Sequence, residues 1–410
     1  MTSQLQKLIA SQPNSDSLLA RTLQLITEKF IADDDLIYFT HLLLAETPAI
    51  RGRYRLQIES KELRGLIPSL KQLPHRPRGA KNAPADWQFK FIDLFAGSGG
   101  MRLGMQGAGG KCVFSSEIDN FARATYFRNF GEVPFGDIKA VDPDDIPQHD
   151  VLVGGFPCQP FSIAGLQRGL RDERGGLFFE IESILETHEP RAFLLENVGG
   201  LRSRRSIATL NMMVERVRGI GYHCPQPRIL NARYFGVPQN RPRVFIVGFR
   251  SKAAESRFEY PRGRNDKVQV RSILSGEPVD SRYYLSEQLL STLRAHKLRH
   301  GKRGNGFGLQ ILDIDSVANT IVVGGMGHER NLIQDLNLTR THKDAKDLRK
   351  RNSEGIRRMT PHEWAGLQGY PRDFKFPVSD TQAYKQLGNS VAVPLIKSLG
   401  KEIIRALSRS

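Results

Sequence analysis

The stretch Phe89-Lys-Phe-Ile-Asp-Leu-Phe-Ala-Gly-Ser-Gly-Gly100 joins a short apolar run to a turn that is rich in glycine. Such a run predicts a buried strand, and a helix is expected directly after the turn, over residues 101–108. Glycines between a strand and a helix let a ligand approach the backbone closely, and the helix N-terminus offers free N–H groups to an anion. The turn departs from G-x-G-x-x-G, because Arg102 stands three residues after Gly99, and no Gly-Lys-Ser/Thr follows. The stretch therefore favours a nucleotide-binding α/β protein that is not a P-loop protein.

Four more short apolar runs follow the first, at residues 111–117, 150–156, 191–197 and 243–249. Helices are expected between most of them, over residues 121–130, 177–187 and 207–219. Alternating strands and helices with continuous apolar strands predict a parallel sheet that is covered by helices on both faces. The expected fold class is thus α/β with a Rossmann-like sheet. After Phe249 this rhythm breaks: residues 251–356 are irregular, and residues 357–410 end in an amphipathic helix.

Composition limits the classes of partner. The chain of 410 residues carries a net charge of +17, which suits a polyanion because Lys and Arg bind phosphates by releasing counterions; a merely soluble basic chain is the alternative. No apolar run approaches the ~20 residues that span a bilayer, and the N-terminus lacks a secretory signal. The three cysteines stand in unrelated contexts, which indicates a reducing compartment. We interpret no cysteine or histidine pattern as a metal site and expect none.

Residues 1–86 precede the first strand. Leucine and isoleucine recur near helical spacing, so we expect a helical extension up to about residue 72, followed by a basic linker rich in proline. This part of the chain carries no motif with evident chemistry.

A single thiol stands at the end of the third expected strand, in Gly154-Gly-Phe-Pro-Cys-Gln-Pro-Phe-Ser162. Pro157 and Pro160 hold Cys158 on stiff backbone. A cysteine nucleophile needs a lowered pKa or a substrate that a neighbouring acid makes electrophilic. Glu196 closes the next strand and is expected at the same sheet edge, and Gln239-Asn-Arg-Pro-Arg243 adds Arg241 and Arg243 on one face. The alternative for Cys158 is a small buried hydrophobe, which we expect of Cys112 and Cys224.

Two acids follow other strand ends. Glu117 is placed to accept hydrogen bonds from a ribose diol, and Asp137 from an adenine amino group. For each of them a solvated cap is the alternative.

Together these stretches resemble the ordered motifs of DNA cytosine-5 methyltransferases, and of the bacterial restriction-modification enzymes in particular. Besides those quoted above, Glu196-Asn-Val, Arg358-Met-Thr-Pro, Leu367-Gln-Gly-Tyr-Pro and Gln386-Leu-Gly-Asn-Ser-Val carry the resemblance, which covers residue 88 to the C-terminus. It implies S-adenosylmethionine as the methyl donor, S-adenosylhomocysteine as the product, and a base flipped out of double-stranded DNA.

The resemblance also implies roles for single residues. Cys158 adds to C6 of cytosine, Glu196 holds and protonates N3, and Arg243 stabilises the base with Arg241 nearby. In the cofactor site Glu117 takes the ribose hydroxyls and Asp137 the adenine amino group. The other cofactor residues are Phe95, Gly97, Gly99, Gly100, Ile118, Pro157 and Asn389.

DNA contacts are expected in two places. Residues 162–176 resemble the family's mobile catalytic loop and carry Ser162, Arg168, Arg171 and Arg174. Residues 251–356 are expected to form a target-recognition domain, while 87–250 and 357–410 together form the catalytic domain. Within 251–356, phosphate contacts are expected from Arg294, Lys297, Arg299, Lys302 and Arg303, for which a solvated helix face is the alternative.

We further expect a monomer in the bacterial cytoplasm, associated with the nucleoid through DNA, that protects host DNA from a cognate restriction endonuclease. Gly304-Asn-Gly-Phe-Gly followed by Thr320-Ile resembles recognition domains that read short palindromes containing CC. Three alternatives stay open: a DNA-binding regulator, a tRNA cytosine-5 methyltransferase of similar architecture, and an oxidoreductase that uses nicotinamide.

Overall fold

The structure is a computed structural model that describes residues 87–132, 134–156, 176–204, 206–264, 268–276, 279–302, 304, 308–324, 329–335 and 352–408. The predictions for residues 1–86 and for Pro157, Cys158, Ser162, Arg168, Arg171, Arg174 and Arg303 lie outside these residues.

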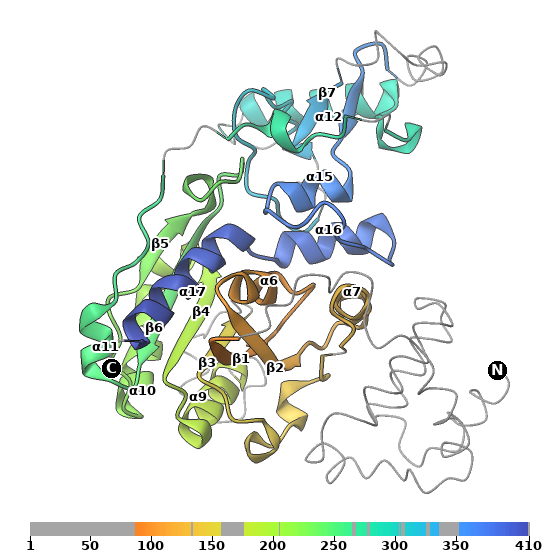
Figure 1. Ribbon diagram of the computed structural model, residues 1–410. Helices are drawn as coiled ribbons and strands as arrows, with labels where there is room; N and C mark the ends of the chain where they lie inside the picture. The colour runs from red at the N-terminus through yellow and green to blue at the C-terminus, as the bar shows by residue number, and fades with distance from the viewer. Residues whose placement is uncertain are drawn as a thin grey trace, which may run out of the picture.

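A mixed six-stranded sheet forms the centre of the protein, in the order β2-β1-β3-β4-β6-β5 (Figure 1). Its strands are β1 (Phe89–Leu94), β2 (Gly110–Ser116), β3 (Val151–Gly155), β4 (Ala192–Val198), β5 (Arg228–Asn231) and β6 (Pro242–Phe249). All five strands predicted from apolar runs are present, and their ends agree to within one residue.

The prediction of an entirely parallel sheet is wrong at one edge. Strands β2, β1, β3 and β4 are parallel, but β6 runs antiparallel to both β4 and β5. After β4 the chain forms β5 one strand position further out in the sheet. Strand β6 then runs back between β4 and β5. Strand β5 was not predicted, because its four residues are exposed or half-buried and form no continuous apolar run.

Nine α-helices are described: α6 (Gly100–Gly107), α7 (Asn120–Phe130), α9 (Gly176–His188), α10 (Ile207–Gly219), α11 (Lys252–Arg257), α12 (Glu287–Lys302), α15 (Pro361–Gly366), α16 (Asp380–Asn389) and α17 (Val393–Leu407). Short 3₁₀ helices lie at Ile138–Ala140, Pro143–Asp145, Gly199–Arg202, Ala232–Tyr234, Val270–Ile273 and Ser281–Tyr283. The first four α-helices confirm the predicted ones. Among the described residues no helix is long and apolar enough to cross a membrane.

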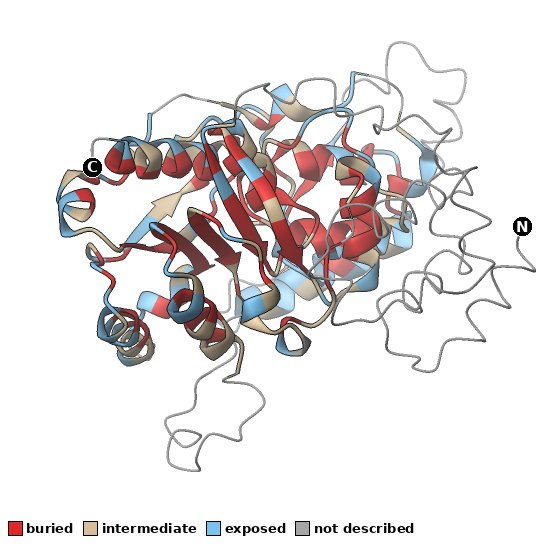
Figure 2. Cartoon of the chain, turned by 60° about the horizontal axis from the view of Figure 1, so that its bottom comes forward, coloured by how far each residue is buried: buried red, intermediate tan, exposed pale blue. Residues whose placement is uncertain are grey.

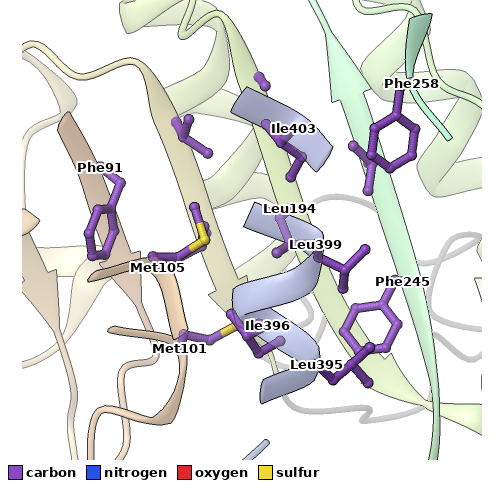
Figure 3. Packing of buried hydrophobic residues seen from close by; sticks show 14 of the residues in the cluster. Phe91, Met101, Met105, Leu194, Phe245, Phe258, Leu395, Ile396, Leu399 and Ile403 are labelled. Carbon is purple, nitrogen blue, oxygen red and sulfur yellow. The ribbon is translucent and has the colours of Figure 1, made fainter. Parts of the chain in front are cut away.

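Helices cover both faces of the sheet, so its strands are largely buried (Figure 2). Alternation along β1 directs Phe91 to one face and Ile92 to the other. On the first face, α6 and the C-terminal helix α17 pack over the strands through Met101, Met105 and Ile396 (Figure 3). On the second face, α9 and α10 contribute the buried side chains of Ile181, Leu210 and others.

The last part of the chain therefore packs beside the first strand, as α17 shows. Helices α15 and α16 pack differently, because Trp364 and Leu387 share a hydrophobic cluster with Val270, Ile321 and Ile333. Strand β7 (Leu332–Gln334) also pairs with β8 (Ile356–Arg358), which contains the expected boundary between residues 356 and 357. Packing is thus continuous across that boundary, and the division into domains stays a proposal.

Candidate active site

Glu196 and Arg243 form a buried ion pair where β4 ends, with Arg243 Nε 3.0 Å from Glu196 Oε1. The two residues are diagonal neighbours on the antiparallel ladder, since Glu196 opposes Phe245 and Val198 opposes Arg243. Burial raises the pKa of the Glu196 carboxyl, and the guanidinium groups of Arg243 and Arg241 lower it in part. A carboxyl group in this setting can exchange a proton with a bound base.

The strand that leads to the expected nucleophile is paired with this acid. Gly155, the last residue of β3, lies opposite Glu196 in the parallel ladder. A Cβ atom on Gly155 would lie 3.3 Å from Glu196 Oε2, so the missing side chain leaves the carboxyl group open on this side. Asn197 Nδ2 donates to the carbonyl oxygen of Phe156 at 3.1 Å and holds the beginning of the segment that follows.

The other two cysteines do not qualify as nucleophiles. Cys112 and Cys224 are buried, and burial raises the pKa of each thiol to about 12. This confirms the expectation that both are small buried side chains.

Arg241 does not reach toward Glu196 with a hydrogen bond. Its buried guanidinium donates to backbone carbonyls, to Ile321 at 2.8 Å, to Gly388 at 3.0 Å and to Ser390. The nearby Gln239 is tied in the same way: its side chain donates to Leu367 O at 3.0 Å and accepts from Ile321 N at 3.2 Å. These contacts indicate that Arg241 holds the end of α16 and Gln239 the end of α15 against the sheet edge. The Gln-Asn-Arg-Pro-Arg motif alone did not predict this role.

The glycine turn after β1 has one open position and two packed ones. A Cβ atom on Gly97 would meet nothing within 4 Å, whereas one on Gly99 would lie 2.2 Å from the Phe130 ring and one on Gly100 2.4 Å from Ser390 Oγ. Phe95 and Gly97 have positive φ angles of 57° and 54°. The turn thus exposes backbone at Gly97 for a ligand, while Gly99 and Gly100 let neighbouring side chains approach.

The acid after β2 points at this turn. Glu117 Oε2 accepts the backbone N–H of Gly97 at 2.8 Å, and Oε1 accepts that of Asp119 at 2.7 Å. Burial raises the pKa of Glu117. The next residue, Ile118, is 65% exposed although isoleucine is usually buried. An open glycine turn, an oriented carboxylate and an exposed apolar side chain fit the sugar and base of an adenosine.

Asp137 and Asn389 are the remaining described residues that the resemblance assigns to the cofactor site. Asp137 Oδ1 accepts the N–H of Lys139 at 3.0 Å and caps a short 3₁₀ helix, which agrees with the alternative of a cap. Asn389 is exposed at the end of α16. Its neighbour Ser390 lies next to the glycine turn, since Tyr370 OH is 2.5 Å from Ser390 Oγ and 3.0 Å from Ser98 Oγ.

The basic residues expected to contact DNA lie on α12. Lys297, Arg299 and Lys302 are exposed. Arg294 instead forms a bidentate ion pair with Glu354, with N–O distances of 2.6 and 2.7 Å, so its charge is already matched. No group of three or more His, Cys, Asp or Glu side chains in the described part of the chain could hold a metal ion.

Comparison with known proteins identifies the class. The chain belongs to the C-5 cytosine-specific DNA methylase family, which matches residues 89–405. It is 50% identical over 326 residues to the type II methyltransferase M.HpaII of Haemophilus parainfluenzae, covering 78% of this chain and 90% of that protein. It is also 43% identical over 328 residues to M1.ScrFI of Lactococcus lactis subsp. cremoris, covering 79% and 80%. The protein is therefore a DNA cytosine-5 methyltransferase related to bacterial restriction-modification enzymes, and the oxidoreductase alternative is excluded.

Solved structures share the fold at lower identity. Dnmt2 methyltransferase of S. pombe aligns with a TM-score of 0.59 at 21% identity, over 78% of this chain and 99% of that one. A putative DNA modification methyltransferase from an E. coli prophage aligns with a TM-score of 0.55 at 21% identity, over 78% and 100%. Family membership implies S-adenosylmethionine as the methyl donor, and the residues around Gly97 and Glu117 fit it.

Proposed function

We propose that the protein methylates C5 of one cytosine within a short, specific sequence of double-stranded DNA, through a covalent bond between Cys158 Sγ and C6. The observation that carries this proposal is the buried Glu196–Arg243 pair beside the end of β3. Cys158 lies three residues after Gly155, a length of chain that spans at most about 11 Å. Because Gly155 is the ladder partner of Glu196, the thiol is within reach of a base bound at this carboxyl group.

The chemistry requires an acid at this place. C6 of neutral cytosine is a poor electrophile, and proton donation from the Glu196 carboxyl to N3 lets the ring accept the thiolate without forming a carbanion. Arg243 holds that carboxyl group and stabilises the base and its adduct. S-Adenosylmethionine supplies the electrophilic methyl group that C5 takes. Loss of the C5 proton then restores the double bond and expels Cys158.

A cytosine can enter such a buried site only after it has left the DNA helix. We assign the loop with Ser162, Arg168, Arg171 and Arg174 to closing over the flipped base. Exposed Lys297, Arg299 and Lys302 on α12 are assigned to phosphates, with Arg303 following them in the chain.

The cofactor site is assigned to the end of β1 and β2. Phe95 and Gly97 line it with backbone, Glu117 accepts the ribose hydroxyls, and Ile118 contacts the adenine ring, with Asp137 at the amino group. Pro157 and Asn389 complete it, and Gly99 and Gly100 allow the turn to pack. We further propose that the protein protects bacterial host DNA from a cognate endonuclease. In this proposal it is a monomer in the cytoplasm and is associated with the nucleoid.

A mechanism-based trap tests the proposal. The protein is incubated with S-adenosylmethionine and genomic DNA fragments that contain 5-fluorocytosine, whose fluorine cannot leave as a proton does. We expect a covalent complex that survives denaturation. Sequencing of the trapped DNA is expected to show one recurring motif. Cys158→Ser abolishes the complex while DNA binding persists. A complex that forms with Cys158→Ser, or one that forms with tRNA and not with duplex DNA, would overturn the assignment.

A further inference from the structure

A hydrogen-bonded chain connects α16 to the glycine turn. Lys385 Nζ lies 2.6 Å from Asp119 Oδ2. Asp119 N donates to Glu117 Oε1 at 2.7 Å, and Gly97 N donates to Glu117 Oε2 at 2.8 Å. Three consecutive polar contacts therefore link a lysine near the C-terminus to the backbone of the turn after β1, and the Glu117 carboxylate is in the middle.

Asp119 has little freedom in this chain. Its Oδ1 accepts the N–H groups of Phe121 at 2.9 Å and Ala122 at 3.1 Å, and so caps α7. With one oxygen bound to the helix and the other to Lys385, the carboxylate has a fixed orientation. The backbone N–H of Asp119, which orients Glu117, is then fixed as well.

We propose that Lys385 is a positioning residue of the methyl-transfer reaction: through Asp119 it holds the Glu117 carboxylate ionised and oriented toward the ribose hydroxyls of the cofactor. This inference rests on the proposed assignment of Glu117 to the ribose. It gives α16 two tasks in one site, since Ser390 at its end lies against the glycine turn and Lys385, just over one turn earlier, supports Glu117.

Charge gives the physical reason. The charge of Asp119 disfavours the ionised form of Glu117, whereas that of Arg123 favours it. The Lys385 ammonium offsets the charge of Asp119. Without it, the Asp119 carboxylate stands unmatched beside a buried acid whose pKa is already raised by burial. The Glu117 carboxylate would then take up a proton more readily and accept hydrogen bonds from the ribose less well.

The experiment measures the affinity of the full-length protein for S-adenosylhomocysteine and for its 2′,3′-dideoxyribose analogue by calorimetry. The Lys385 side chain is 46% exposed and that of Asp119 25%, so for Lys385→Met we expect a loss of about two- to fivefold in affinity for S-adenosylhomocysteine. Affinity for the analogue stays at the wild-type value, because the lost interaction acts through the ribose hydroxyls. Lys385→Arg restores the affinity, and adding Asp119→Asn to Lys385→Met, which keeps the helix cap and removes the unmatched charge beside Glu117, restores most of it.

The pH dependence provides a second measurement. As pH is lowered, affinity of Lys385→Met for S-adenosylhomocysteine falls at a higher pH than that of the wild type, because Glu117 is protonated earlier. The matched control is Lys252→Met, which removes a lysine from the exposed ion pair with Glu255 on α11 and leaves both affinities unchanged.

Two outcomes overturn the inference separately from the proposed function. If Lys385→Met weakens both ligands equally, or neither, while Glu117→Ala weakens only the ligand with ribose hydroxyls, Lys385 has no positioning role and the assignment of Glu117 stands. If Glu117→Ala binds both ligands as the wild type does, the assignment of Glu117 is wrong and the inference falls with it.

Discussion

Arg243 Nε lies 3.0 Å from Glu196 Oε1, and both side chains are nearly buried, at 13% and 10% exposure. Breaking a buried pair leaves an unmatched charge, which is much less favourable than replacing both partners. The pair therefore affects the stability of the fold as well as the proposed reaction. Substitution of one partner or of both can measure its effect on stability.

Arg243→Met is expected to lower the free energy of unfolding at pH 8 by about 3–5 kcal/mol, because Glu196 stays buried without its partner. The loss is smaller at pH 5. The higher pKa of the unpaired Glu196 lets it remain protonated in the folded state, and that stabilisation disappears as pH rises toward this pKa. Urea denaturation at both pH values measures the effect. The double variant Arg243→Met/Glu196→Gln should recover most of the stability, and a double variant as unstable as the single one would contradict this explanation.

Arg241→Met is expected to destabilise the protein by several kcal/mol, roughly 1.5–3 for each charge-assisted hydrogen bond that is lost, because the guanidinium serves three carbonyl oxygens. Arg241→Lys should restore little, since an ammonium does not match this planar arrangement. Thermal and urea denaturation measure both variants. A normally stable Arg241→Met protein without methyl transfer would instead assign this residue to the reaction.

Ile118→Ser is expected to leave the free energy of unfolding within about 0.5 kcal/mol of the wild type, because the side chain is 65% exposed. Its affinity for S-adenosylmethionine should fall by roughly tenfold, which corresponds to losing about 1.5 kcal/mol of apolar contact with the adenine ring. Calorimetry with ligand and denaturation without it separate the two effects. Leu298→Ser, at a residue of α12 that is 64% exposed, is the control for exposure alone. Unchanged affinity in Ile118→Ser would place the adenine elsewhere.

Strands could be predicted from the sequence where a continuous apolar run marks them. The apolar runs at β1, β2, β3, β4 and β6 mark buried strands, whereas Arg228-Ile-Leu-Asn231 has no such run and its strand was missed. The direction of β6 depends on the gap left beside β4, which is a property of the whole sheet. Strand ends located Glu117 and Glu196 for the same local reason.

The motifs did not predict contacts between residues that are far apart in the sequence. Nothing in the sequence near Lys385 indicates Asp119, 266 residues earlier, or shows that Glu354 matches the charge of Arg294. The carbonyl partners of Arg241 were equally hidden, because a backbone oxygen has no signature in sequence. Motifs therefore indicated the residues that we propose as reactive groups, while the structure was needed to find what supports Glu117 and Glu196.

Gly104→Ala tests the packing of the C-terminal helix α17 on α6. A Cβ atom at Gly104 would lie 2.5 Å from two side-chain carbons of Ile396 in α17, so we expect a loss of about 1–3 kcal/mol in unfolding free energy despite the better helix propensity of alanine. The control is Gly219→Ala at the end of α10, where nothing lies within 4 Å of the new atom and a gain of up to about 1 kcal/mol is expected. Equal effects of the two substitutions would show that α17 does not press on α6 in solution.

Asp93 gives stability a pH dependence of unusual sign for an aspartate. Burial raises its pKa from 3.8 to about 8, against the influence of the Arg102 guanidinium. The folded state keeps the proton up to that pH, while the unfolded state releases it above pH 3.8. The stabilisation is therefore complete at low pH and is lost as pH rises toward 8, by at most about 1.4 kcal/mol per pH unit.

Asp93→Asn cannot ionise and isolates this contribution. Between pH 4 and pH 8, the unfolding free energy of the wild type is expected to fall by roughly a few kcal/mol relative to that of Asp93→Asn. Above pH 8 the difference between the two proteins should stay constant. Urea denaturation in steps of one pH unit measures it. Asp315→Asn is the matched control: the Arg271 guanidinium lowers the pKa of this exposed acid, so its contribution is constant above pH 5. A difference for Asp93→Asn that is equally constant would mean that the Asp93 carboxyl is ionised in the folded protein, and that Arg102 outweighs the effect of burial.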